Sequence, residues 1–129
     1  MKRVFKTRHF CRWMRKTELT NYMLCNAVAE MAQELIDADL GDGVVKKRIG
    51  LAGRGKRGGA RILVATNKGD RWFFVFGFEK NERANVADDE LAALQDIAAQ
   101  LLARDGWQLD EAIKDGSLQE ICDDDKDQD

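Results

Sequence analysis

The sequence of 129 residues contains no proline, one histidine and three cysteines. Without proline, no segment is typical of a stiff linker. The cysteines, Cys11, Cys25 and Cys122, include no CxxC pair, and their odd number argues against a disulfide framework and for a reduced, cytoplasmic location. No apolar run approaches the roughly 18 to 20 residues of a membrane span. No continuous apolar segment follows the basic start, which argues against a secretory signal.

Catalytic patterns that depend on histidine, metal ligands or a nucleotide loop are also missing. His9 is the single histidine, and its position beside aromatic residues favours a helix surface over a catalytic triad. No His or Cys spacing indicates a metal site. The glycine-rich stretch 53–59 lacks the GxxxxGK[ST] pattern and leads into a predicted strand, which argues against a P-loop.

Charge is distributed unevenly along the chain, although the net charge is only −2. Residues 1–86 hold 18 Lys and Arg against 9 Asp and Glu, a balance of +9. Residues 87–129 hold 3 against 14, a balance of −11. This division predicts a basic working surface and an acidic end. Residues 123–129 hold five aspartates and no apolar residue, so we expect a disordered acidic tail there.

Hydrophobic periodicity predicts a chain of the α+β class. The expected helices cover residues 9–16, 20–38, 88–104 and 110–114, and the expected strands cover residues 3–7, 44–51, 60–67, 71–78 and 117–122. Thr20 is the predicted N-cap of the helix at 20–38. Gly106 is expected to stop the helix at 88–104. The three central strands are expected to form an antiparallel meander, with a hairpin turn at 67–70. The glycine-rich stretch 53–59 is predicted to be a basic loop.

The strand at 71–78 is aromatic on both of its expected faces. Strict alternation places one set of rings together, namely Trp72, Phe74, Phe76 and Phe78. Phe73 and Val75 then share the other face. One face must pack on helices, and the second can offer a surface on which nucleic-acid bases stack.

Basic residues gather around the predicted meander. They are Lys46, Lys47, Arg48, Arg54, Lys56, Arg57, Arg61, Lys80 and Arg83. In an antiparallel meander these positions can converge at one end of one face. Glycines let backbone N–H groups and cations approach a phosphate closely, so such a cluster would bind a polyanion.

The order Val-Val-Lys-Lys-Arg-Ile, Gly-Lys-Arg-Gly-Gly-Ala-Arg and Phe-Glu-Lys-Asn-Glu-Arg resembles the RelE/ParE toxin superfamily, and within it the HigB-like branch. The resemblance implies N-terminal helices packed on a small antiparallel sheet, to which the C-terminal helix and acidic tail expected above are added. It implies one toxin domain over residues 1–122, with its core at 2–104 and an extension at 105–122.

The resemblance also implies a function. RelE-like toxins cut mRNA in the ribosomal A site and are neutralised by a cognate antitoxin, which we expect to be of the helix-turn-helix type. By the same resemblance, Arg61 and Lys80 are the catalytic residues of a metal-independent endoribonuclease with no cofactor. The supporting RNA-binding cations are Lys46, Arg48, Arg54, Lys56, Arg57 and Arg83. The chain departs from the family pattern at two points. RNA-cutting members often carry a tyrosine or similar ring near the chain end, but the only tyrosine here is Tyr22, on an early helix. Asn81 follows Lys80, where many relatives have arginine.

The residue types suit RNA cleavage by the 2′-oxygen. Arg61 has the planar donor fork that matches phosphate oxygens. Lys80 can stabilise the same charge, or it can act as a base if cationic neighbours depress its pKa. Two other functions stay open: a ParE-like gyrase inhibitor, and a non-catalytic RNA- or ribosome-binding module. Arg61 is alternatively a strand-end arginine paired with Glu79 or Glu82, and Lys80 a solvated turn residue.

Overall fold

The computed structural model describes residues 1–51 and 55–122, and residues 55–57 by their backbone alone. Within this part of the chain, six strands form one sheet: β1 (Arg3–Thr7), β2 (Ala38–Gly41), β3 (Val44–Leu51), β4 (Gly55–Thr66), β5 (Arg71–Glu79) and β6 (Leu118–Ile121). Four helices accompany it: α1 (Arg8–Met14), α2 (Asn21–Ala32), α3 (Asp88–Leu102) and α4 (Gly106–Asp115). The α+β class is therefore confirmed.

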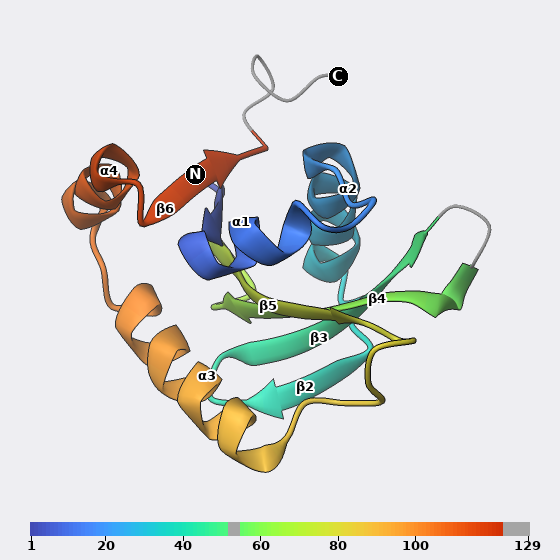
Figure 1. Cartoon of the computed structure of the whole chain (residues 1–129). Helices are drawn as coiled ribbons and strands as arrows, with labels where there is room; N and C mark the ends of the chain where they lie inside the picture. Colours follow the sequence, from blue (N-terminus) through green and yellow to red (C-terminus); the bar gives the residue numbers. More distant parts are fainter. Residues whose placement is uncertain (52–54, 123–129) are drawn as a thin grey trace.

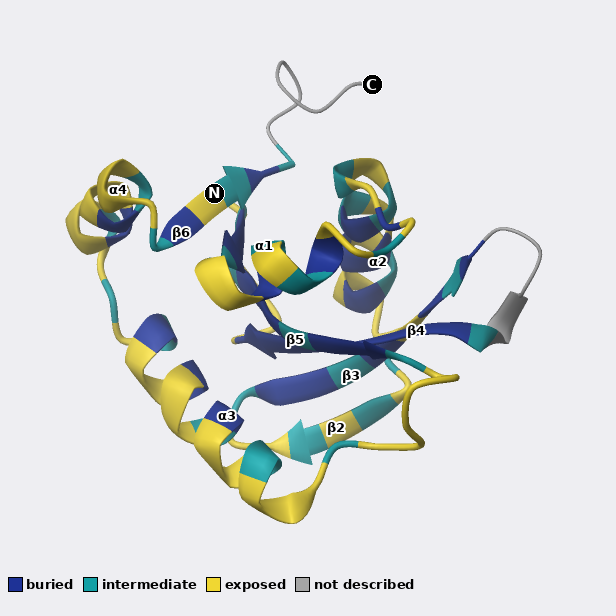
Figure 2. Ribbon diagram, viewed as in Figure 1, coloured by how far each residue is buried: buried dark blue, intermediate teal, exposed yellow. Residues whose placement is uncertain are grey.

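The sheet has the strand order β2-β3-β4-β5-β1-β6. All neighbours are antiparallel except β1 and β5, which run parallel. Figure 1 shows α1 and α2 on one side of the sheet and α3 on the other. Each side buries its own apolar cluster against the central strands, which are dark blue in Figure 2. The predicted meander is thus the middle of a wider sheet.

The second helix is shorter than its periodicity predicted. Thr20 caps it as expected, because its side chain accepts a hydrogen bond from the backbone N–H of Met23. The helix ends at Ala32, not at 38, and Glu34 then adopts a left-handed conformation with φ of 68°. Leu35, predicted on the apolar stripe, is 56% exposed. The chain turns early because residues 38–41 are used as edge strand β2.

Two glycine assignments also differ from expectation. Gly55 to Gly59 belong to β4 and not to a loop, because the backbone pairs with β3 across a register shift after Ile49. Gly106 does not stop α3, which ends at Leu102. It is instead the first residue of α4, whose N-cap Asp105 accepts a hydrogen bond from the backbone N–H of Gln108.

A β-bulge changes which aromatic rings share a face of β5. Leu63 pairs with Phe76 but Val64 pairs with Phe74, so Val75 is an extra residue on β5. Trp72 and Phe74 therefore lie in the core under α1 and α2, and Phe78 lies in the core on the α3 side. The predicted single face for Trp72, Phe74, Phe76 and Phe78 was wrong. Strict alternation fails wherever one strand holds an additional residue.

Cys25 of α2 and Cys122, just after β6, form a disulfide. The cysteine count argued against any such bond, so that expectation was wrong. The two residues are 97 positions apart in sequence, yet their Cα atoms lie 5.5 Å apart because α2 packs beside the end of β6. Cys11 is a free cysteine. None of the described helices has the length and apolar character needed to span a bilayer.

Candidate active site

Three neighbouring strands bring two arginines and a phenylalanine onto one face of the sheet. Arg48 of β3 stands opposite Arg61 of β4, and Arg61 stands opposite Phe78 of β5. Directly opposed residues of an antiparallel pair have Cβ atoms about 4.5–5.5 Å apart. Phe78 belongs to the apolar core on the α3 side, so all three residues lie on that side. The register thus brings together two of the predicted site residues.

Arg61 is held in a buried and positively charged environment. The residue is 8% exposed. Burial lowers the pKa of its guanidinium, and the charge of Arg48 lowers it further, whereas the Asp37 carboxylate acts in the opposite direction. An arginine stays protonated at neutral pH even so. An anion that docks between Arg48 and Arg61 would relieve their repulsion, so the pair favours phosphate.

Asp37 fixes the orientation of Arg48. Its two carboxylate oxygens accept hydrogen bonds from the backbone N–H of Arg48 at 2.7 Å and from the Nε of Arg48 at 2.8 Å. Burial alone would raise the pKa of Asp37, but these bonds and the arginine charge lower it overall. Asp37 was not predicted as a site residue, because it fell inside the helix expected to reach residue 38. The available signal was the carboxylate of Asp37 itself, which lies after the helix once the helix is taken to end at Ala32.

Two predicted lysines lie beside the arginine pair. Lys46 is two residues before Arg48 on the same strand, and its Nζ lies 3.5 Å from Oδ1 of Asn85. Lys80 is exposed and immediately follows β5. Its backbone N–H donates to the carbonyl of Gly59 at 3.1 Å, which places it about two strand residues, roughly 7 Å, along β4 from Arg61. Both lysines therefore border the site.

Arg83 is anchored by two rings and a carboxylate. Its guanidinium carbon lies 5.2 Å from the ring centre of Phe76 and 5.5 Å from that of Phe78. Its Nη1 forms an ion pair with Glu90 in the first turn of α3. The hydrogen bond with Glu90 raises the pKa of Arg83 and lowers that of Glu90. The turn after β5 thus presents a fixed cation next to Phe78.

The remaining predicted cations lie partly outside the described residues. Arg54 is outside them, and Lys56 and Arg57 are described only as backbone of β4. The expected acidic tail at 123–129 also lies outside them. Within the described residues, no group of His, Cys, Asp or Glu side chains is arranged to hold a metal ion. The described part of the site is therefore cationic and aromatic.

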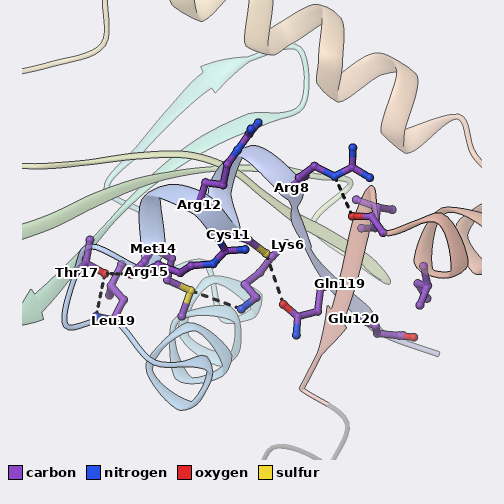
Figure 3. A pocket seen from close by; sticks show the side chains of 13 residues that line it. Lys6, Arg8, Cys11, Arg12, Met14, Arg15, Thr17, Leu19, Gln119 and Glu120 are labelled. Atoms are coloured by element: carbon purple, nitrogen blue, oxygen red, sulfur yellow. Dashed lines mark hydrogen bonds between the residues drawn. The ribbon is translucent and has the colours of Figure 1, made fainter.

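A larger hollow lies elsewhere in the described part of the molecule. It measures about 1140 Å³ and runs between α1 and β6. Figure 3 shows its lining, which includes Lys6, Arg8, Arg15 and Gln119. Lys6 is 6% exposed and its Nζ donates to Oδ1 of Asn21 at 2.8 Å, so it is part of the packing. None of the predicted site residues lines this hollow.

The comparison with protein families agrees with these observations. The family model described as the RelE toxin of the RelE/RelB toxin–antitoxin system matches residues 2–121. The chain therefore belongs to the RelE family, the toxins of type II toxin–antitoxin systems. Toxins of this family are generally endoribonucleases, and each system includes a cognate antitoxin. No curated protein matches the sequence.

Proposed function

We propose that this toxin is an endoribonuclease that cuts mRNA on the ribosome and so inhibits translation. The observation that supports this activity best is the register of Arg48 and Arg61 on one face, with Lys46 and Lys80 bordering them. A cluster of cations around a buried arginine suits one phosphate of an RNA chain. The cognate antitoxin, of the helix-turn-helix type in our proposal, would neutralise the toxin.

The proposed reaction is a transesterification that needs no metal. The 2′-oxygen of one nucleotide attacks the adjacent phosphorus, and the bond from phosphorus to the 5′-oxygen breaks. The 2′-hydroxyl loses its proton, the 5′-oxygen gains one, and a 2′,3′-cyclic phosphate remains. Arg61 stabilises the extra negative charge on the phosphorane with its paired N–H donors. Arg48, oriented by Asp37, holds the neighbouring phosphate oxygens.

Lys80 has two possible tasks in this reaction. As an ammonium it would share the stabilisation of the phosphorane with Arg61. As an amine it would accept the 2′ proton. The variant Lys80→Arg separates the tasks, because arginine keeps the positive charge but cannot accept the proton.

The test is to map mRNA 5′ ends in cells after brief induction of the chain and of two variants, Arg61→Ala and Lys80→Ala. New ends inside translated regions with the wild type, and their loss in both variants, support the proposal. The matched controls are Arg71→Ala and Lys68→Ala, a strand-end arginine and a turn lysine that are each paired with a carboxylate away from the site. Both controls should still cut.

The outcome also separates the alternative functions. Growth arrest without new 5′ ends, together with loss of plasmid supercoiling, would contradict the proposal and indicate a gyrase inhibitor. Growth arrest with intact mRNA and intact supercoiling would indicate a toxin that binds RNA or the ribosome without cutting. Equal cutting by the wild type and Arg61→Ala would remove Arg61 from the catalytic set.

A further inference from the structure

A second, smaller hollow is lined in part by Phe78, the residue opposite Arg61 on the next strand. It measures about 390 Å³ and lies between α1 and the last residues of β5. The lining residues that matter here are His9, Arg12, Lys16, Phe76, Phe78 and Arg83. Phe78, one of the lining residues, stands opposite Arg61 across the β4–β5 ladder, where neighbouring strands lie about 5 Å apart.

The topology explains why this hollow is lined with rings. Strand β1 ends at Thr7, whereas its neighbour β5 continues to Glu79. The end of β5 therefore has α1 beside it instead of another strand. The imidazole of His9 stacks on Phe76 with ring centres 5.9 Å apart and an angle of 4° between the planes. Stacked rings that line a surface hollow are suited to a planar ligand.

A glycine allows α1 to approach the strand this closely. A Cβ atom on Gly77 would lie 2.3 Å from Cζ3 of Trp13, so any side chain at position 77 would push the indole away. Trp13 also lines the hollow. The absence of a side chain at Gly77 therefore sets the position of α1 and, with it, the position of the ring of His9.

The hollow is positively charged. Arg12 and Lys16 enter it from α1 and the turn after it, and Arg83 enters it from the turn after β5. Glu82 is the one acidic residue among the described lining residues, and its carboxylate accepts a hydrogen bond from the backbone N–H of Glu79 at 2.8 Å. Cations beside aromatic rings are the combination that binds single-stranded nucleic acids.

We propose that this hollow binds one nucleotide of the RNA substrate next to the phosphate that is cut. The base would stack on the His9–Phe76 pair, and Arg12 and Lys16 would contact its phosphate. The volume lies near the lower end of the range for small-ligand sites, which suits a single nucleotide. The inference rests on the proposed function for its ligand, RNA. It assigns α1 and His9 to substrate binding, beyond the arginine pair.

The test measures binding of the purified chain to a fluorescein-labelled single-stranded RNA octanucleotide by fluorescence anisotropy. Phe76→Leu keeps an apolar side chain but removes the ring, and it should weaken binding at least about fivefold, since one base–ring stack contributes about that much. Lys16→Gln should lower the slope of log affinity against log salt by roughly 0.7, as expected for one lost phosphate contact.

Arg15→Gln is the matched control. It removes one positive charge from the residue next to Lys16, but Arg15 lines the large hollow on the other side of α1 and not this one. Figure 3 shows Arg15 extending along that hollow towards Cys11, and Arg12 lines both hollows. At physiological ionic strength, where screening acts over about 8 Å, Arg15→Gln should leave the affinity within about twofold. Circular dichroism checks that each variant is folded.

Three results would overturn the inference. They are unchanged affinity with Phe76→Leu, equal losses with Lys16→Gln and Arg15→Gln, and no binding of the octanucleotide by the wild type up to about 100 μM, the weak end of non-specific nucleic-acid binding. The proposed function fails separately. If the chain cuts no mRNA in cells but shows the selective loss of affinity, the nucleotide site stands without the nuclease. Cleavage with unchanged affinities refutes only the nucleotide site.

Discussion

Replacing Arg61 with methionine should strongly reduce RNA cleavage without destabilising the fold. Burial of the guanidinium and the charge of Arg48 both disfavour the charged form of Arg61 in the folded state, and they lower its pKa overall although Asp37 acts in the opposite direction. At a separation of about 6 Å, two unit charges repel by about 0.7 kcal/mol in water and about 3 kcal/mol at an effective dielectric constant of 20. The side chain of Arg48 is 43% exposed, which places the repulsion near the lower end, about 1 kcal/mol.

Asp37 offsets part of this repulsion, and methionine replaces the packing of the arginine alkyl chain. We therefore expect the free energy of unfolding of Arg61→Met to equal that of the wild type or to exceed it by up to about 1 kcal/mol. Cleavage should fall by roughly 100- to 1,000-fold, the usual effect of removing one donor that stabilises a transition state. Urea denaturation gives the first quantity. Primer extension on mRNA in a cell-free translation reaction gives the second.

Lys47 offers the matched control, because it is a buried cation on the same sheet. Its Nζ lies 2.7 Å from the carboxylate of Glu30 and donates to the carbonyl of Leu35 at 2.8 Å. Lys47→Met should lose about 1–3 kcal/mol of stability, since it leaves the Leu35 carbonyl without its donor, and it should still cut. The reasoning is refuted if Arg61→Met loses more than about 2 kcal/mol, because Arg61 would then be a structural ion-pair residue.

Three further predictions concern the framework of the site. Asp37→Asn should reduce stability by about 1 kcal/mol at neutral pH. Because the pKa of Asp37 lies below its ordinary value of 3.8, this contribution is present above that pH and is lost as the pH falls through the lowered pKa, so urea titrations of the two proteins should converge in acid. Cys122→Ser should lower the free energy of unfolding by about 2–4 kcal/mol without reductant and leave it unchanged with reductant, because the variant lacks the disulfide to Cys25. A wild-type unfolding midpoint that is the same with and without reductant would contradict the disulfide. Gly77→Ala should cost about 1–3 kcal/mol and shift the fluorescence of Trp13, and an unchanged melting temperature would contradict the close packing.

Local patterns predicted the elements well where local physics decides them. Thr20 was found as a cap because the side-chain hydroxyl of a cap acts on an N–H three residues away. The hairpin turn at 67–70 was found because its residues favour turn geometry. The end of α2 was not found, since Leu35 continues the apolar period and only the pairing of β2 with β3 ends the helix. The disulfide was missed for the same reason, because it depends on contacts 97 residues apart in sequence.

The same division explains which parts of the candidate site could be predicted. The grouping of Arg48, Arg61 and Lys80 could be expected because they stand at fixed offsets in or just after short strands, and a meander aligns such offsets. Their roles in catalysis and RNA binding came from the family resemblance and stay predictions. The ring pair of His9 and Phe76 could not be expected, because it requires β1 to end before β5 does and a bulge at Val75 to redirect the following rings. Neither event leaves a local mark on the sequence. A residue set aside as an ordinary helix-surface histidine can therefore face the substrate.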